Sequence, residues 1–402
     1  MGGIAYGFDP AGSPYNRRME FDVVVVGGGL VGATLARALR GAQVGLIAQE
    51  RPAAPGAGFD SRVYAISPGN ARFLEGLQAW QRMPEARATP VHAMRVHGDD
   101  GRSVLEFDAY RAGVSELAWI VEDGWLQDAL WQELAVQDRL QLFAPAACER
   151  LEIGGEAARL ALRDGRTLAA RLVIGADGAH SSMREQAGIE AQERAYGQVA
   201  VVANFACQRR HDNVALQWFQ GGPVLALLPL PGDHVSMVWS TTQAHAARLL
   251  ALAPPALALE VAQASQHALG ELAVVTPARG FPLRRMIAQR MVAPRLALVG
   301  DAAHVVHPLA GQGANLGFQD ARELAQVLAA RGPYRDPGDL RLLRRYERAR
   351  AEAILAMRGA VHGLYWLFDV RSAPLAWLRN AGLNLTNRLS VMKNVLMRQA
   401  MN

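Results

Sequence analysis

Several features that identify particular classes of protein are scarce or missing in this chain. Its 402 residues include only two cysteines, Cys148 and Cys207, without a CxxC pair or a histidine at metal-ligand spacing. The sequence therefore predicts neither a disulfide framework nor a zinc site, and no other metal site stands out. No apolar run approaches the roughly 18 residues that cross a bilayer, and the N-terminus lacks the apolar core of a signal peptide. These absences favour a reduced, cytoplasmic setting.

Charge is also modest and dispersed. Charged residues make up 20% of the chain, the net charge is +5, and arginine dominates the cations without forming a block. The sequence therefore predicts no nucleic-acid partner and favours a solvated, arginine-rich surface. A chain of this length suits about two domains. Residues 1–18 are rich in glycine, proline and small residues, so we expect a disordered leader there.

The first positive signal is a glycine-rich turn. Gly27, Gly29 and Gly32 form G-x-G-x-x-G, in which the first glycine permits a tight turn, the second lets the backbone approach a pyrophosphate, and the third allows close helix packing. Glu50 stands where an acid binds ribose hydroxyls. Apolar patterning predicts a strand, a helix and a strand around the motif, at 21–26, 33–39 and 44–48. Together these features predict a dinucleotide site and leave FAD and NAD both open.

A second segment follows a buried strand predicted at 171–175. Asp177-Gly178 alone would be an ordinary turn, but the strand before it and Arg184 after it make the segment more specific. It resembles the DG motif of class A flavoprotein hydroxylases. In that family the motif lies beside the pyrophosphate and the cleft where NAD(P)H delivers its hydride.

The third segment is the strongest signal. A strand predicted at 295–299 runs into Asp301, whose carboxylate can accept hydrogen bonds from ribityl hydroxyls. The loop 311–313 has little side-chain bulk, so its N–H groups can approach a flat ring. The helix after Asn315 directs its positive end at that ring and can stabilise negative charge on a reduced flavin. A nicotinamide enzyme has no need of this segment, so the sequence predicts FAD as the tightly held cofactor.

Two histidines, His304 and His307, lie within the third segment. One interpretation is that either of them transfers protons during the reaction. The other, which we favour, is that they pack or hydrogen-bond near the flavin loop.

With these segments in place, the chain resembles the ubiquinone-biosynthesis hydroxylases, the UbiH/UbiF/VisC group of class A FAD monooxygenases, from about residue 21 to 401. Asp60 and Arg62 resemble the D-x-R loop over the flavin, and Gln127 resembles the family's glutamine that approaches the cofactor. One departure matters. The family has Asn-Arg where residues 123–125 read Asp-Gly-Trp, so a cofactor-facing arginine is absent and Arg62 or Arg184 would have to replace it.

The resemblance implies tightly bound FAD, NAD(P)H as a transient electron donor, and hydroxylation of a polyprenylated phenol by O₂ through a flavin hydroperoxide. Other ubiquinone-biosynthesis enzymes are partners that it allows. The expected catalytic positions are Pro308, Gly311, Gly313 and His304. The expected cofactor-binding residues are Gly27, Gly29, Gly32, Glu50, Arg62, Gln127, Asp177, Arg184, Gly300, Asp301, Gly311, Gln312, Gly313 and Asn315.

Three alternatives stay open. One is an FAD-dependent phenol hydroxylase of another pathway, with a small soluble substrate. A second is a non-catalytic flavoprotein that scaffolds a biosynthetic complex. A third is a prenyl-chain reductase or a halogenase, although the halogenase signature W-x-W-x-I-P is missing.

The order of the patterns predicts an α/β fold, in which a Rossmann-like FAD-binding domain is interleaved with a mainly antiparallel β-sheet substrate domain and followed by C-terminal helices, as in para-hydroxybenzoate hydroxylase. Further strands are expected at 90–107, 147–170, 200–205, 215–219, 224–229, 235–240 and 273–283, and further helices at 60–77, 125–136 and 256–269. The expected divisions are a leader (1–18), FAD-binding parts (19–89, 119–190 and 286–335), substrate parts (90–118 and 191–285) and a C-terminal helical region (336–402).

Two regions bear on the substrate and on partners. Candidate apolar pocket walls are Leu216, Phe219, Leu225, Leu227, Met237 and Trp239, about half of which alternation assigns to ordinary core. Residues 361–401 mix aromatic and basic side chains. They either form a surface for peripheral lipid contact or for a partner enzyme, or they are helices packed on the FAD domain, which aromatic residues at helical spacing favour.

Overall fold

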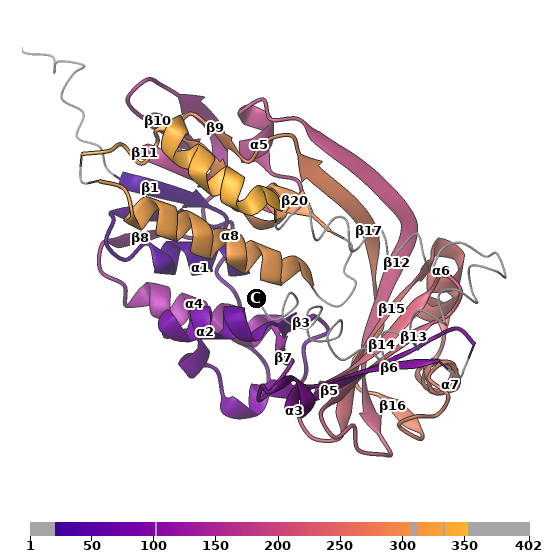
Figure 1. Ribbon diagram of the computed structural model, residues 1–402. Coiled ribbons are helices and arrows are strands. Elements are labelled where there is room, and N and C mark those ends of the chain that lie inside the picture. The colour runs from indigo at the N-terminus through magenta and orange to yellow at the C-terminus, as the bar shows by residue number, and fades with distance from the viewer. Residues whose placement is uncertain (1–20, 101–102, 307–311, 333, 353–402) are drawn as a thin grey trace, which may run out of the picture.

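The computed structural model describes residues 21–100, 103–306, 312–332 and 334–352 (Figure 1). The predicted leader, His307, Pro308, Gly311 and the aromatic and basic tail lie outside these ranges. The α-helices are α1 (Leu30–Ala38), α2 (Pro68–Gly76), α3 (Ala109–Ala112), α4 (Asp123–Ala135), α5 (Ser182–Gln186), α6 (Gln243–Ala251), α7 (Pro254–Ala264) and α8 (Gln312–Ala329). Three 3₁₀ turns are η1 (Trp80–Arg82), η2 (Glu85–Arg87) and η3 (Gly300–Ala302), and a further helix covers residues 340–352.

The strands form three sheets. The first sheet runs β18 (Val292–Ala293), β19 (Leu296–Leu298), β11 (Thr167–Gly175), β1 (Phe21–Val26), β2 (Val44–Ile47) and β8 (Leu140–Phe143), with β10 (Ala158–Leu162) and β9 (Cys148–Ile153) added beside β11. The second runs β20 (His304–Val305), β17 (Arg279–Ala288), β12 (Ala191–Cys207), β15 (His234–Thr242), β14 (Val224–Leu230), β13 (Val214–Phe219), β5 (Ala93–His97) and β6 (Val104–Asp108), with β16 (Leu272–Val274) beside β12. The third is β3 (Val63–Ile66), β7 (Ala118–Glu122) and β4 (Ala88–Val91).

The first sheet contains the predicted dinucleotide-binding core. Strands β19, β11, β1, β2 and β8 are parallel neighbours, and β1 is almost wholly buried, as its continuous β-branched run predicts. Helices α1, α4 and α8 contribute their apolar faces to the same core cluster. The strands of this sheet come from three separated stretches of the chain, with the other sheets between them, so the predicted interleaved α/β fold class is confirmed. The residue boundaries of the two domains stay predictions.

The second sheet is antiparallel except where β13 pairs with β5. Its two longest strands, β12 and β17, arch from the first sheet towards the far side of the molecule (Figure 1). The sequence predicts a strand only at 200–205, but β12 begins at Ala191 because its polar, exposed first half pairs with β17. Exposed polar residues hide the alternation that identifies a strand.

Other differences from the predicted elements are local. Strands β3 and β8 and helix α6 were not predicted, and α7 ends at Ala264, five residues before the predicted end. Helix α1 starts at Leu30 rather than at residue 33, because Gly29 already takes the cap position. Within the described ranges, no helix is both long and apolar enough to cross a membrane.

Candidate functional site

The glycine turn after β1 is closely packed on one side and open on the other. Gly27 has a φ of +118°, and a Cβ there would collide with the carbonyl group of Ala176. A Cβ on Gly32 would collide with the carbonyl oxygen of Gly27. By contrast, a Cβ on Gly29 would meet no atom within 4 Å, and Gly29 caps α1 without any side-chain hydrogen bond. The first N–H groups of α1 therefore lie beside open space, as a bound phosphate requires.

The three predicted cofactor segments meet at one edge of the first sheet. The backbone N–H of Ala176 donates to Val26 at 2.8 Å, and that of Val299 donates to Gly175 at 3.0 Å. Strands β1, β11 and β19 are parallel neighbours, so the turns that follow them lie side by side at their carboxyl ends. Ligands bind at this edge in open α/β sheets.

The first and third segments are joined by contacts that exclude side chains. Gly300 has a φ of +58°, and a Cβ there would lie 3.2 Å from the nearest methyl carbon of Val31. A Cβ on Gly317 would collide with the same methyl group. The start of α1 therefore packs directly on the Gly300 turn and on α8.

Helix α4 supports the glycine turn from the side. The Nε1 of Trp131 donates to the carbonyl of Gly28 at 2.9 Å, and the Nε2 of Gln127 approaches the same oxygen at 3.4 Å. Gln127 therefore lies beside the turn, and its approach to the cofactor stays a prediction, while Trp131 was missed because an indole on a helix is usually core. Glu50 is exposed, three residues beyond the end of β2.

The loop before β3 is fixed by a buried polar network. The carboxylate of Asp60 accepts hydrogen bonds from the N–H of Arg62 at 2.9 Å and from the N–H of Gly124 at 3.2 Å. The N–H of Asp60 donates to Glu122 at 2.6 Å, and its carbonyl accepts from Asn204 at 2.7 Å. Asp60 thereby ties the start of α4 and the second sheet to the loop that carries Arg62.

Arg62 faces the open part of the site. Its guanidinium lies over the ring of Phe281, 5.5 Å from the ring centroid, and 3.8 Å from Asp123, while 53% of its side chain stays exposed. Tyr64 lies beside both charged groups. Burial, followed by the negative charges of Asp123 and Asp301, raises the pKa of Tyr64, so its hydroxyl stays protonated as a hydrogen-bond donor. No sequence signal pointed to Tyr64.

The second segment is held together by its own side chains. The carboxylate of Asp177 accepts hydrogen bonds from Ser181 at 2.5 Å, Ser182 at 3.1 Å and the N–H of Met183 at 3.1 Å. It therefore stabilises the start of α5. Its predicted contact with the cofactor stays a prediction.

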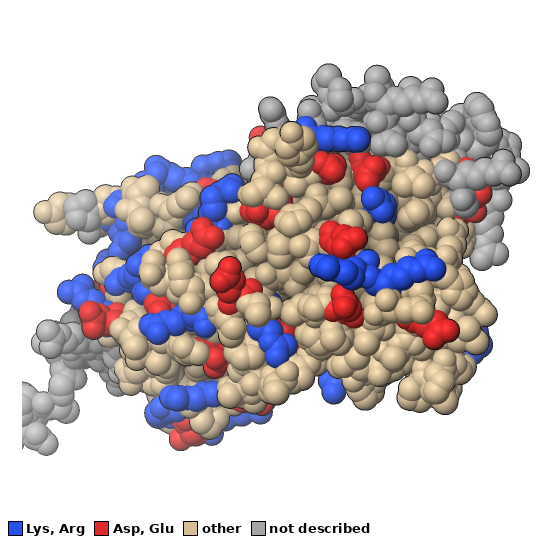
Figure 2. Space-filling model, turned by 90° about the horizontal axis from the view of Figure 1, so that it is seen from below, with Lys and Arg blue, Asp and Glu red and all other residues tan. Residues whose placement is uncertain are grey.

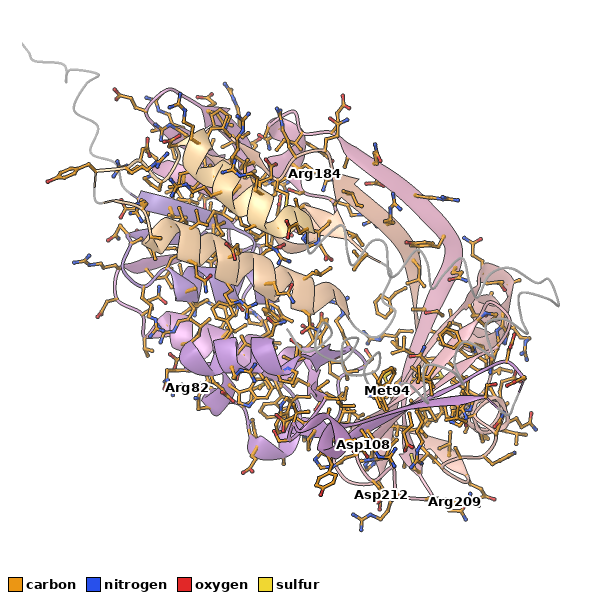
Figure 3. All side chains as sticks on the ribbon, in the orientation of Figure 1. Arg82, Met94, Asp108, Arg184, Arg209 and Asp212 are labelled. Atoms are coloured by element: carbon orange, nitrogen blue, oxygen red, sulfur yellow. The ribbon has the colours of Figure 1, made fainter. Side chains whose placement is uncertain are left out.

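Arg184 connects the second segment to the third. It is 4% exposed, and its guanidinium donates to the carbonyls of Ala179 at 3.1 Å and Ala302 at 3.0 Å. Figure 3 places it near α5 and β20. The guanidinium of Arg184 already donates to two carbonyls. Of the two arginines that could replace the one missing from the family pattern, Arg62 is therefore the better placed.

Asp301 lies in the η3 turn that follows β19 at this edge. The residue is accessible to solvent, yet burial by the surrounding atoms raises the pKa of its carboxyl, against the opposing charges of His304, Arg62 and Arg284. An accessible carboxylate can accept hydrogen bonds from the hydroxyls of a polyol chain.

His304 lies behind the Gly300 turn. Its ring is 3% exposed, and its Nε2 lies 2.7 Å from Asp320, which also accepts the N–H of Gly300 at 2.9 Å and the Nε of Arg350 at 2.7 Å. This geometry favours the packing interpretation of His304, and a proton-transfer role stays a prediction. Asp320 and Arg350 were not singled out from the sequence, because a charged residue on a helix usually faces water.

The start of α8 is bound to the β3–α2 connection. The side chain of Asn315 accepts from the N–H of Ser67 at 2.9 Å and from Asn70 at 2.8 Å, and it donates to Ala65 at 2.7 Å. A Cβ on Gly313 would meet no described atom within 4 Å, so the first turn of α8 borders open space. The side chain of Gln312 lies outside the description, as do Pro308 and Gly311.

The register of the second sheet separates the candidate wall residues. Five of the six lie in a core cluster with α6 and α7, namely Leu216, Leu225, Leu227, Met237 and Trp239. Phe219 lies in a different cluster with Val96 and Leu105. The expectation that only about half of these six residues are ordinary core was therefore wrong, because five of them lie in one core cluster.

A different set of residues lies on the opposite face. Cross-strand pairs place five small or apolar residues together there: Ala200, Val202, Ala226, Val238 and Phe281. None of the five belongs to a core cluster of the described residues, although Ala200 and Val202 are only 4% and 8% exposed, and the polar residues Gln217 and Ser240 share this face. Phe281 lies under the Arg62 guanidinium, so this inner patch adjoins the cofactor loop.

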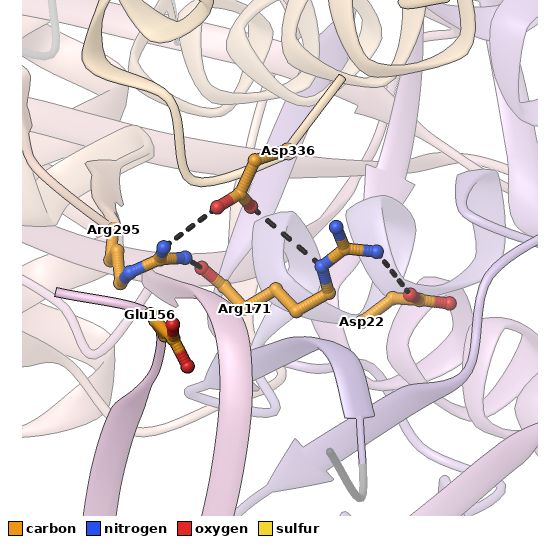
Figure 4. A pocket seen from close by; sticks show the side chains of 5 residues that line it. All are labelled: Asp22, Glu156, Arg171, Arg295 and Asp336. Atoms are coloured by element: carbon orange, nitrogen blue, oxygen red, sulfur yellow. Dashed lines mark hydrogen bonds and ion pairs between the residues drawn. The ribbon is translucent and has the colours of Figure 1, made fainter. Parts of the chain in front are cut away.

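One charged hollow lies elsewhere and has a structural explanation. It has a volume of about 390 Å³ and is lined by Asp22, Glu156, Arg171, Arg295 and Asp336 (Figure 4). Arg295 pairs with Asp336 at 2.7 Å, and Arg171 lies 3.7 Å from Asp336 and 3.9 Å from Asp22. Asp22 lies at the amino end of β1, opposite the glycine turns, so these ion pairs brace the far edge of the sheet.

Comparisons with known proteins agree with this geometry. A family profile described as an FAD binding domain matches residues 20–358. The chain is 36% identical to ubiquinone hydroxylase UbiL of Rhodospirillum rubrum, over 94% of this chain and 89% of the relative. It is 34% identical to 3-demethoxyubiquinol 3-hydroxylase of Escherichia coli, over 94% of this chain and 98% of that relative. The solved structure of PqsL, a probable FAD-dependent monooxygenase from Pseudomonas aeruginosa, matches the fold with a TM-score of 0.76 at 24% identity. The match covers 90% of this chain and 99% of PqsL.

The His304–Asp320 pair predicts a pH-dependent stability. Burial opposes a charge on the imidazole, but the charge of Asp320 and the hydrogen bond to it prevail and raise the pKa of His304. A raised folded-state pKa contributes stability that is complete below the unfolded value of about 6.5 and disappears as the pH rises through the folded value. Urea unfolding should therefore show that the advantage of wild type over His304→Gln shrinks between about pH 6 and pH 9. A constant difference across this range would contradict the ion pair.

FAD binding tests the cradle residues. We expect Asp301→Ala to remove a ribityl acceptor, and Gly313→Trp to fill the open space beside α8, so both proteins should be purified largely free of FAD. Asp138→Ala changes an exposed carboxylate away from the cradle and should retain it. Flavin absorbance per protein after desalting measures the outcome. Full occupancy in both cradle variants would refute the assignment.

Proposed function

The chain belongs to the FAD-binding-domain family of monooxygenases and, within it, to the ubiquinone hydroxylases, and from this membership we propose that it hydroxylates the aromatic ring of a polyprenylated phenol, using O₂ and NAD(P)H. FAD is its cofactor and it is an enzyme. The proposal concerns the substrate, the donor site and the residues that act on them.

The described residues fit FAD. Open space beside the Gly29 cap of α1 suits the pyrophosphate, accessible Asp301 suits the ribityl chain, and the first turn of α8 suits the ring. When bound, FAD supplies hydride acceptance and oxygen activation, so the protein contributes orientation, exclusion of water and electrostatics. Arg62 offers a positive charge beside the ring position, and the Tyr64 hydroxyl offers a hydrogen bond there.

The observation that supports a lipid-like substrate is the inner patch of the second sheet. Ala200, Val202, Ala226 and Val238 are short side chains at adjoining register positions, and no described core cluster includes them. Short apolar side chains leave space that an isoprenoid chain can fill. A small soluble phenol, the main alternative substrate, needs no such extended apolar surface.

The transient donor has a candidate anion site beside the second segment. Arg284 Nη2 lies 2.6 Å from His180 Nε2, and the charge of Arg284 acts on the carboxyl of Asp301. This pair joins β17 to the turn after β11, next to the cofactor edge. A guanidinium at this place suits a phosphate group of NAD(P)H.

Peripheral lipid contact is supported by the distribution of charge along the chain. The last 50 residues hold six of the 42 basic residues and one of the 37 acidic residues, so they account for the entire net charge of +5. On one face of the described part, basic and acidic side chains are interspersed (Figure 2). A basic, aromatic tail is attracted to anionic lipid, where a polyprenylated substrate dissolves.

The function is tested by profiling quinones in a strain that lacks this protein. We expect loss of ubiquinone and accumulation of one prenylphenol, whose missing hydroxyl identifies the ring position. Wild-type protein should restore the profile, and Asp301→Ala should not. Normal ubiquinone without an accumulated prenylphenol would reject the proposal.

The inner patch is tested by filling it. Ala226→Trp should lower kcat/KM for a substrate with several isoprene units by more than about tenfold, because removing chain contacts of a few kcal/mol has that effect. A one-isoprene analogue should be affected much less. Ala273→Trp, at an exposed position of β16 in the same sheet, is the matched control. Equal losses for both chain lengths would exclude the patch as the chain-binding surface.

A further inference from the structure

A buried group of charges lies directly behind the cofactor edge. Asp320 of α8 is fully buried, His304 of β20 is 3% exposed and Arg350 is 6% exposed. Arg350 lies in the helix of residues 340–352, far along the chain from the cofactor segments. Burying charges costs free energy unless each is paired and hydrogen-bonded, so this arrangement needs an explanation.

Asp320 is the centre of the group. Its Oδ1 accepts the Nε of Arg350 at 2.7 Å, and its Oδ2 accepts the N–H of Gly300 at 2.9 Å and lies 2.7 Å from the Nε2 of His304. Burial disfavours its charge, yet the partners prevail and keep the pKa of Asp320 below its usual value. Asp320 therefore stays ionised and fully satisfied.

Two of the three partners of Asp320, Gly300 and His304, belong to elements of the cofactor edge. Gly300 precedes Asp301, which offers the ribityl acceptor, and His304 belongs to β20, which leads towards the flavin loop. Arg350 is the one partner from outside that edge. Its Nη2 also approaches the carbonyl of Leu316 at 3.4 Å and Gln319 at 3.2 Å, so it spans the first half of α8.

The same helix has a second, separate attachment to the first sheet. The hydroxyl of Tyr346, fully buried, donates to the carbonyl of Leu298 in β19 at 2.9 Å. This bond fastens the helix to the sheet without contacting Asp320. The attachment of the helix therefore does not by itself require a charge at residue 350.

We propose that Arg350 is a positioning residue for the flavin: by fixing the ionised carboxylate of Asp320, it sets the orientation of the Gly300–Asp301 turn and contributes positive charge behind the cofactor. This inference rests on the assignment of that turn to FAD. A guanidinium suits the task because its planar, divergent N–H groups reach the carboxylate and α8 together. Reduced flavin is more negative than oxidised flavin, so a buried cation nearby favours reduction.

The test compares Arg350→Met with Arg350→Lys. We expect Arg350→Met to raise the FAD Kd by roughly tenfold or more, since a buried carboxylate loses a charged partner, and to lower the midpoint potential of the bound flavin. Arg350→Lys keeps the charge but not the planar fork, so its potential should stay near wild type while its Kd rises less. If Arg350→Met gives no folded protein, Arg350→Gln replaces it, because an amide can still donate to Asp320.

Two controls separate positioning from simple stability. Tyr346→Phe removes a hydrogen bond that attaches the helix to β19, while Glu347 still accepts from the N–H of Met291, and it should lower the melting temperature without changing the FAD Kd or the flavin potential. Arg348→Met removes an exposed charge from the same helix and should change none of these. A wild-type FAD Kd and potential in the neutral Arg350 variant would overturn the proposal. The proposal would also be overturned if every neutral Arg350 variant failed to fold and Arg350→Lys had the FAD Kd and flavin potential of the wild type. Failure of wild-type protein to bind FAD would instead count against the flavin assignment itself.

Discussion

The contact of Val31 with Gly300 and Gly317 is the constraint on which the rest of the site depends. These two glycines let the first turn of α1 touch both the turn after β19 and the first half of α8. A side chain at either glycine would push the helix N-terminus away from Asp301. The N–H groups at the start of α1 and the carboxylate of Asp301 can bind the same elongated ligand only if the distance between them is kept. The Val31 side chain lies directly against the two glycines, so no room is left for a Cβ at either position without a change in that distance.

Buried carboxylates paired with arginine hold the surrounding elements in place. Glu122 accepts from Arg87 at 3.0 Å and fixes the Asp60 loop, Glu133 accepts from Arg37 at 2.6 Å and fixes α1 to α4, and Asp320 holds the Gly300 turn. All three are at most 3% exposed. Some of the arginines therefore pair with buried carboxylates and do not belong to a solvated surface. Guanidinium groups satisfy several oxygens at once, which suits buried pairs better than an ammonium does.

The second sheet gives the site its apolar side. Its outer face is filled by α6 and α7, so the large side chains Leu225, Met237 and Trp239 are core. Its inner face carries the short side chains and adjoins the loop held by Asp60 and Asn204. The inner face thus combines short apolar side chains with polar ones such as Ser240 and Gln217, and it is the face proposed to bind the substrate.

The three glycine segments, the FAD cofactor and the interleaved α/β fold followed from the sequence alone. This was so because a strand–glycine–helix pattern is local and its chemistry depends on the backbone. Gly27, Gly32 and the β-branched run of β1 carry that information within a few residues of each other. The D-x-R loop and Gln127 were expected over the flavin from the resemblance, and their contacts with the cofactor stay predictions.

Only the tertiary structure decided which charges and faces meet. Asp320 and Arg350 are thirty residues apart, and a helical sequence does not show which of its charges is buried. Alternation in the second sheet identified two faces but could not say which one α6 and α7 would cover, because that depends on how the helices pack on the sheet. Pairing between distant segments is a property of packing, and packing depends on every element at once. The sequence thus determined the cofactor and the reaction class, while the packing determined how the cofactor edge is held and which face of the second sheet α6 and α7 cover.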